Sequence, residues 1–199
     1  MTTTRRSLES LFRRSATTRS RELVAAGFSR SQLSRMVATG QLVRVARGLY
    51  TLPDYQSSEH GTLAAVAKRA PDVLFCLLTA LRFHDLTSQA PFEVWIAISN
   101  KAHPPRLNYP PLRTVRFSEA ALKDGVETHL VEGTKIRVTS VAKTVADCFK
   151  FRNKIGLDVA MEALREARRA KKVTADELWR FAKINRVTNV MRPYLEAVT

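Results

Sequence analysis

The stretch GFSRSQLSRMVATGQLVRVARGLY, residues 27–50, constrains the fold of this chain more than any other segment. Gly27 is placed to end one helix in a left-handed conformation, and Ser29 is placed to cap the next one. Gln32 occupies the third helical position, as in a capping box. Apolar residues then repeat at i, i+3 and i+4, which predicts a helix to about residue 39 with one buried stripe. That stripe consists of Leu33, Met36 and Val37.

A β-hairpin is predicted directly after this helix. Residues 41–46 form its first strand, in which Val43 and Val45 alternate with a polar residue as on the buried face of a half-buried strand. Arg47-Gly48 forms the turn, and residues 49–52 return as the second strand.

Two helices are predicted before this stretch, over residues 5–14 and 19–26. The resulting order of helix, turn, helix and hairpin predicts a winged helix-turn-helix. In such a module the second helix enters the major groove of DNA with its N-terminal residues leading. The side chains facing away from the buried stripe include Arg and Gln, which pair with guanine and adenine, and Ser, which accepts several bases. The predicted DNA-binding residues are Ser29, Arg30, Ser31, Gln32, Ser34 and Arg35 on the helix, with Arg44 and Arg47 on the hairpin.

The net charge of +15 is concentrated at the two ends of the chain. Residues 1–52 and residues 134–199 each carry +8, whereas residues 53–133 carry −1. No Asp or Glu occurs between Arg30 and Leu52. Such a balance favours a polyanionic partner, which for the first module we expect to be duplex DNA. The alternative is a winged helix that contacts protein and exposes a solvated charged face.

The remainder of the chain is predicted to be a mixed α/β domain, which makes the whole an α+β protein. The domains are predicted to span residues 1–54 and 59–199, joined by a short polar linker. Helices are expected over residues 59–70, within the apolar run 73–86 from near Thr79 or slightly before, and over three C-terminal segments. Strands are expected over residues 92–99, 113–117, 126–131 and 134–139, the last two joined by a turn at Glu132-Gly133. Phe92 and Trp95 are assigned to the sheet core, and a loop with four prolines covers residues 103–111.

A helix capped by Ser140 carries the second candidate site. Its expected apolar stripe contains Val145 and Cys148, and charged side chains repeat along the other face. One interpretation is a basic patch that binds a toxin, tRNA or DNA, and the other is a solvated helix face with an i, i+4 ion pair. The residues of this predicted patch are Lys143, Asp147, Lys150, Arg152 and Lys154.

The sequence does not favour enzymatic activity. The acids near predicted strands, Glu93, Glu127 and Glu132, do not form the carboxylate and lysine cluster of a metal-dependent nuclease. No catalytic residue, metal site or cofactor is predicted, because the histidines lack ligand spacing and no Gly-rich phosphate loop occurs. His84 is expected to be a core or capping residue. Cys76 and Cys148 are expected to be reduced and buried in a cytoplasmic protein without a membrane span.

The residues also resemble those of a known family. GFSRSQLSRMVATGQLVRVARGLYTLPD resembles the N-terminal winged helix of the AbiEi antitoxins. CLLTALRFHDLT (76–87), VWIAI (94–98), RVTSVAKTVADCFKFRNKIGLDVAMEALREA (137–167) and MRPYLEA (191–197) resemble later parts of the same family. The chain departs from the family pattern at Ser140-Val-Ala, where Pro-Glu is expected, but Lys143 and Asp147 remain in place.

This resemblance implies an antitoxin of a bacterial abortive-infection system, classed as a type IV toxin–antitoxin pair. It implies that the N-terminal domain binds repeats upstream of its own operon and represses it. It also implies that the C-terminal domain neutralises a nucleotidyltransferase toxin encoded alongside. The alternative is a one-component winged-helix regulator whose C-terminal domain senses a ligand.

Overall fold

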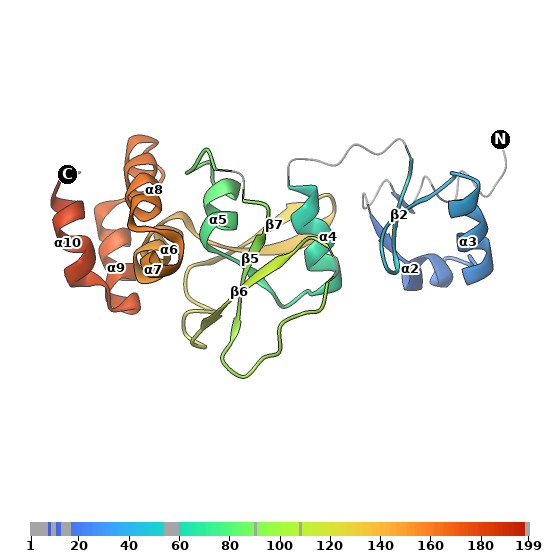
Figure 1. The fold of residues 1–199 in the computed structure, drawn as a ribbon, viewed down its shortest axis with the longest axis horizontal. Coiled ribbons are helices and arrows are strands. Elements are labelled where there is room, and N and C mark those ends of the chain that lie inside the picture. Colours follow the sequence, from blue (N-terminus) through green and yellow to red (C-terminus); the bar gives the residue numbers. More distant parts are fainter. Residues whose placement is uncertain are drawn as a thin grey trace. The chain divides into compact units, whose positions relative to one another are not determined.

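The computed structural model describes residues 8, 11–12, 17–53, 60–89, 91–107 and 109–197 (Figure 1). Contacts divide the chain into one unit of residues 1–71 with 130–136 and another of residues 72–129 with 137–199. The linker predicted after residue 53 lies outside the described residues, as does most of the predicted helix over residues 5–14. The described residues of that helix are Leu8, Leu11 and Phe12, which are helical and pack into the core of the first unit.

Helices α2 (Ser20–Ala25) and α3 (Arg30–Ala38) form where the sequence predicts them. The turn between them is a Schellman motif, in which the Phe28 N–H donates to the Leu23 carbonyl over 3.0 Å. Gly27 has φ +96°, the left-handed conformation that this motif requires. Because Leu23 and Phe28 are also both buried, the turn is stabilised by an apolar contact as well as by backbone hydrogen bonds.

A three-stranded sheet accompanies these helices, in the order β1 (Thr18–Arg19), β3 (Leu49–Thr51), β2 (Val43–Ala46). The two-residue strand β1 is not predicted by the sequence pattern. The expected burial of Val43 and Val45 is wrong, because these side chains are 45% and 46% exposed. The strand β2 lies at the sheet edge, and the register shifts between Arg44 and Ala46, so that Val45 is the extra residue of a bulge.

The first unit also includes helix α4 (Gly61–Arg69), predicted over residues 59–70. Its apolar face is buried as expected, through Leu63, Val66 and Ala67. The unit further includes the tip of the hairpin formed by strands β7 (Val126–Val131) and β8 (Thr134–Thr139). Glu132 and Gly133 have φ +49° and +71°, which gives the tight turn that the sequence predicts.

A five-stranded sheet has the order β6-β5-β4-β8-β7, with β5 at Val94–Ser99 and β6 at Leu112–Phe117. The strand β4 (Leu74–Phe75) pairs antiparallel with β5 and parallel with β8. The helix expected from near Thr79 or slightly before is confirmed as α5 (Leu77–Phe83), but the strand β4 that precedes it is not predicted by the sequence. An apolar run of this kind suits a buried strand and a buried helix equally well.

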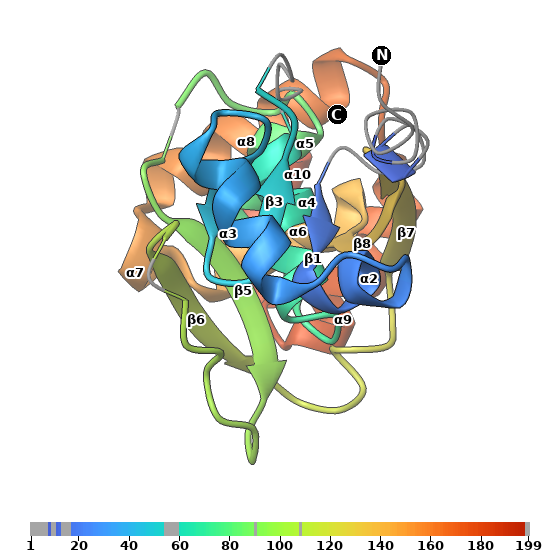
Figure 2. The same ribbon diagram turned by 90° about the vertical axis from the view of Figure 1, so that its right-hand side faces the viewer.

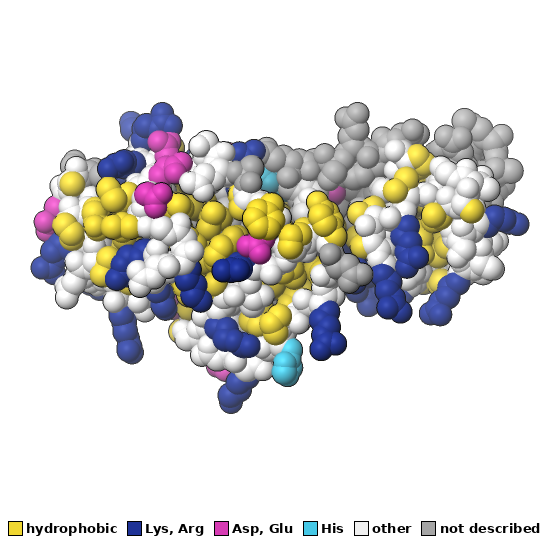
Figure 3. Space-filling view, in the orientation of Figure 1, with side chains coloured by type: hydrophobic (Ala, Val, Ile, Leu, Met, Phe, Trp, Pro, Cys, Tyr) yellow, Lys and Arg dark blue, Asp and Glu magenta, His cyan; other side chains and the backbone are white. Residues whose placement is uncertain are grey.

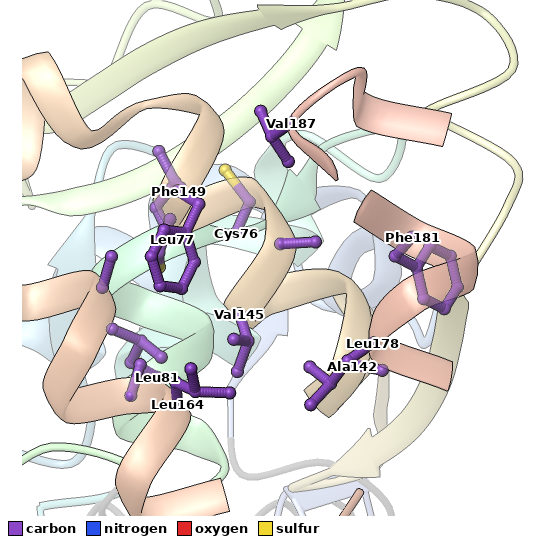
Figure 4. Packing of buried hydrophobic residues seen from close by; sticks show 14 of the residues in the cluster. Cys76, Leu77, Leu81, Ala142, Val145, Phe149, Leu164, Leu178, Phe181 and Val187 are labelled. Atoms are coloured by element: carbon purple, nitrogen blue, oxygen red, sulfur yellow. The ribbon is translucent and has the colours of Figure 1, made fainter. Parts of the chain in front are cut away.

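The C-terminal helices pack around α6 (Val141–Lys150), which Ser140 caps as predicted. Figure 4 shows Ala142, Val145 and Phe149 of this helix among side chains of the neighbouring elements. The other helices are α7 (Arg152–Ile155), α8 (Leu157–Arg169), α9 (Ala175–Asn185) and α10 (Thr188–Ala197).

Three single-residue predictions can be compared with this core. Trp95 is buried in it as expected, but the assignment of Phe92 to the core is wrong, because Phe92 precedes β5 and is 82% exposed. His84 occupies the C-cap position of α5, in line with the expectation, and its Nε2 lies 2.7 Å from the Thr139 carbonyl oxygen at the end of β8. Burial is the main cause that lowers the pKa of His84.

The structure confirms the α+β class, with helices and both sheets in one chain. None of the helices in the described part of the chain is long and apolar enough to cross a bilayer.

Candidate nucleic-acid interface

The eight predicted DNA-binding residues are all exposed in the structure. Six of them lie at the N-cap and in the first turns of α3, on the side opposite the buried Leu33 and Met36. Helix α3 lies on the face of the first unit that is turned toward the viewer in Figure 2. The N-terminal end of α3 is therefore exposed to solvent, while the opposite side of the helix packs against the core. A helix that enters a DNA groove needs this arrangement.

The N-terminus of α3 is held by a reciprocal capping box. The Ser29 Oγ accepts from the Gln32 N–H over 3.2 Å, and the Ser29 N–H donates to Gln32 Oε1 over 2.7 Å. The Ser31 hydroxyl lies 2.9 Å from that of Ser29. Bidentate pairing of Gln with adenine uses both the amide oxygen and the amide nitrogen. Because the cap holds the Gln32 oxygen against the backbone, the structure favours a positioning role for Gln32 and leaves Arg30 and Arg35 as the stronger candidates for base contacts.

The hairpin adds a second set of exposed groups. Arg44 and Arg47 are exposed at β2 and at its turn, as predicted. The exposed Val43 and Val45 lie beside them, although their alternation with Arg44 predicts a strand with one buried face. The only signal against that assignment is the position of the strand at a sheet edge, which alternation of residue types does not reveal.

The electrostatic surroundings of α3 are uniformly basic. Glu22 is the only acid in residues 17–53, and its carboxylate accepts from the Arg19 N–H over 2.9 Å at the start of α2. Figure 3 shows Lys and Arg side chains, and no acidic ones, on the visible surface of α2, α3 and β2. A duplex backbone would therefore meet no carboxylate on this face.

The predicted C-terminal patch is contradicted by the structure for two of its five residues. Lys143 and Asp147 are 0% and 1% exposed, because α6 is covered on every side from Ala142 to Phe149. The Lys143 Nζ lies 3.3 Å and 3.2 Å from the two carboxylate oxygens of Asp147. Asn185 Nδ2 on α9 donates to Asp147 Oδ1 over 2.7 Å. These residues form a buried network that holds α6 and α9 together, and they are not available to a partner.

The pKa of the Asp147 carboxyl group reflects both its burial and its partners in this network. Burial is the main cause that raises the pKa of Asp147, and the Lys143 ammonium and the Asn185 amide oppose it. Burial likewise raises the pKa of the Cys76 and Cys148 thiols, which are free and buried as predicted.

The other three residues of the predicted patch lie at the end of α6 and in α7. Lys150 and Lys154 are exposed, whereas Arg152 is half-buried and its guanidinium donates to the Phe149 carbonyl over 3.0 Å. The accessible remainder of the patch is therefore a pair of lysines. Within the described ranges, no three His, Cys, Asp or Glu side chains are grouped in a way that could hold a metal ion.

Comparison with known proteins places the N-terminal module in a class of DNA-binding regulatory domains. Residues 6–53 match a family described as transcriptional regulator, AbiEi antitoxin. This match confirms the resemblance seen in the sequence of the N-terminal module. No curated protein matches the chain.

We expect Gln32→Ala to lower the free energy of unfolding by about 1 kcal/mol, because it removes one half of the capping box. Gln32→Glu keeps an acceptor for the Ser29 N–H and places a negative charge at the helix N-terminus, so it should preserve stability. Urea unfolding followed by circular dichroism measures both effects, with Ser34→Ala on the same helix as the control. Equal stability of the Gln32→Ala variant and the wild type would show that the cap contributes nothing.

Lys143→Met should destabilise the fold by about 3–5 kcal/mol, because it leaves the Asp147 carboxylate buried without its cation. Lys150→Met is the matched control on the same helix, and its exposed side chain predicts a change within about 0.5 kcal/mol. Adding Asp147→Leu to Lys143→Met should recover part of the loss, since no buried charge then remains. The buried network would be refuted if Lys143→Met and Lys150→Met unfolded at the same urea concentration.

Proposed function

We propose that this protein is an antitoxin that represses its own operon by binding repeats in the upstream duplex DNA. The observation that carries the DNA-binding half is the exposed, acid-free N-terminal end of α3, supported from behind by a buried stripe. Its arginines match the bidentate acceptors of guanine, and Arg44 and Arg47 on the hairpin reach the flanking backbone. The family of residues 6–53, described as transcriptional regulator, AbiEi antitoxin, supports the same role.

The antitoxin half of the proposal concerns the second unit. The segments at residues 76–87, 94–98, 137–167 and 191–197 resemble AbiEi antitoxins, and this resemblance supports action against a nucleotidyltransferase toxin encoded alongside. With Lys143 and Asp147 buried, the residues of the earlier patch that remain for such a role are Lys150 and Lys154. We propose that this exposed pair contributes to neutralisation, either at the toxin or at the target of the toxin.

A ligand-sensing regulator is the other candidate. A cavity between α8, α9 and α10 is lined by Arg168, Leu178 and Trp179, among others, and holds about 70 Å³. Cavities that bind small molecules usually measure about 300–1,000 Å³. This cavity therefore does not favour ligand sensing over the antitoxin role.

The DNA-binding proposal predicts that the protein binds its own upstream DNA more tightly than a scrambled duplex. With about six phosphate contacts, the logarithm of the affinity should fall with the logarithm of salt concentration at a slope near −5. Arg35→Ala should weaken specific binding about 5- to 100-fold and reduce discrimination, as loss of a base contact does. Arg47→Ala should weaken binding to both duplexes and reduce the slope by about one.

Fluorescence anisotropy with both duplexes measures these effects. Arg192→Ala, an exposed arginine of α10, is the control and should leave specific binding unchanged. Equal, weak binding of the wild type to both duplexes would contradict the proposed autorepression and favour a protein partner for α3.

The antitoxin proposal predicts that co-expression of this protein restores growth to cells that produce the neighbouring toxin. Lys150→Glu with Lys154→Glu should weaken that rescue, because both charges are exposed and both are reversed. The control is Lys183→Glu, an exposed lysine of α9. Growth restored fully by the double variant would dismiss the lysine pair, and an operon without a nucleotidyltransferase gene would overturn the antitoxin role itself.

A further inference from the structure

The strands β5 and β6 and the loop that joins them form an uninterrupted stretch without acidic residues. Residues 94–117 contain four Lys and Arg residues, one His and no Asp or Glu, and the nearest acids in the sequence are Glu93 and Glu119. The strands are parallel and in register from Val94 opposite Leu112 to Ser99 opposite Phe117. The loop of residues 100–111 must therefore return along the whole length of the strands, about 17 Å at 3.3 Å per residue. Because β6 is an edge strand, this region is an outer border of the sheet.

Two aromatic side chains are exposed at the beginning of these strands. Phe92 precedes β5 and Tyr109 precedes β6, and they are 82% and 72% exposed. Both lie at the same end of the sheet, because the strands run parallel and the Val94 N–H donates to the Pro111 carbonyl over 2.9 Å. Large aromatic side chains are usually at least half-buried when they only stabilise a fold. Two aromatic rings that project into solvent at the same end of a sheet therefore indicate a ligand with flat faces.

Basic side chains continue from this end along the edge. The Arg113 guanidinium lies 5.7 Å from the centre of the Trp95 ring, and its side chain is exposed. Arg116 donates to the carbonyls of Ser99 and Ala102 over 2.9 Å and 3.1 Å, which fixes the start of the returning loop. Lys101 and Arg106 on the loop are exposed. Figure 3 shows several Lys and Arg side chains in the region of β5 and β6, with a few acidic side chains among them.

We propose that this border binds single-stranded nucleic acid. The site, which we name the β6 edge track, consists of Phe92, Lys101, Arg106, Tyr109, Arg113 and Arg116. Its cations neutralise the phosphates of an extended strand, and Phe92 and Tyr109 stack on unpaired bases. Sites for single strands combine a basic path along the backbone with exposed aromatic rings in this way. The stacking depends on no particular base, so the track selects unpaired strands over duplexes and has little sequence preference.

The side chains of the β6 edge track and those of α3 fit different forms of nucleic acid. An α-helix with exposed arginines fits the major groove of a duplex, whose bases are stacked on each other and offer only their edges. Exposed rings gain nothing from bases that are already stacked. An acidic protein segment is the competing ligand, since its negative charge also matches the basic side chains of the track. Asp and Glu side chains, however, offer no flat rings on which the two exposed aromatic side chains could stack.

The test is binding of fluorescein-labelled oligo(dT) and oligo(U) of about 12 nucleotides, a length within known site sizes, to the full chain. Phe92→Ala with Tyr109→Ala should weaken binding at least about tenfold, as the loss of base stacking does. Phe92→Tyr with Tyr109→Phe keeps both rings and should bind within about twofold of the wild type. Both positions are highly exposed, so the fold should be retained, which circular dichroism checks.

Three further measurements decide between the sources of binding. An abasic strand of the same length should bind the wild type more weakly than oligo(dT), and equal binding would overturn stacking. Arg35→Ala should reduce duplex binding and leave single-strand binding unchanged, whereas a parallel loss would place the single strand on α3 and refute the track. Poly-glutamate that binds with the same dependence on Phe92 and Tyr109 would assign the track to an acidic protein.

Discussion

The buried ion pair of Lys143 and Asp147 is the interaction on which the packing of the second unit depends. Two charges removed from water cost less free energy when hydrogen bonds from neighbouring groups satisfy their polar atoms. Here Asn185 of α9 donates to the carboxylate, and the Lys143 Nζ lies 4.8 Å from the centre of the Phe117 ring on β6. Gly125 also matters, because a Cβ at this position would lie 2.5 Å from the Phe181 ring and 3.0 Å from the Lys143 Cβ. The pair therefore fixes α6 against a helix and a strand that are distant in sequence.

Local signals in the sequence were sufficient to predict helices α2 and α3, because the ends of these helices are stabilised by neighbouring residues. The glycine after α2 and the Ser29 cap with its Gln32 partner are both formed as the sequence predicts. Such signals depend on hydrogen bonds that span three or four residues, so they need no knowledge of the tertiary fold. The exposed face of α3, and with it the candidate DNA-binding surface, follows from the same local pattern.

The predictions that failed all depended on contacts between distant segments. Lys143 and Asp147 resemble a surface ion pair in sequence, and only the packing of helices on every side of α6 shows that they are buried. Phe92 precedes a buried strand but lies outside the sheet, and the short β4 cannot be distinguished from helix by apolar residues alone. Val43 and Val45 have the alternation of a half-buried strand, yet an edge position and a bulge expose them. Burial is a property of the whole arrangement, and residue type gives only a tendency.

The two candidate surfaces differ in the way that a basic charge is combined with other groups, and this difference indicates different ligands. On α3 the arginines are accompanied by small polar side chains, so the helix can approach base edges closely without a bulky ring in the way. On the β6 edge track the cations are accompanied by two exposed aromatic rings at the start of parallel strands. Rings of that size would obstruct a groove but provide a platform for unpaired bases. A net charge of +15 attracts any polyanion, and it is these neighbouring groups that determine which form of nucleic acid each surface can hold.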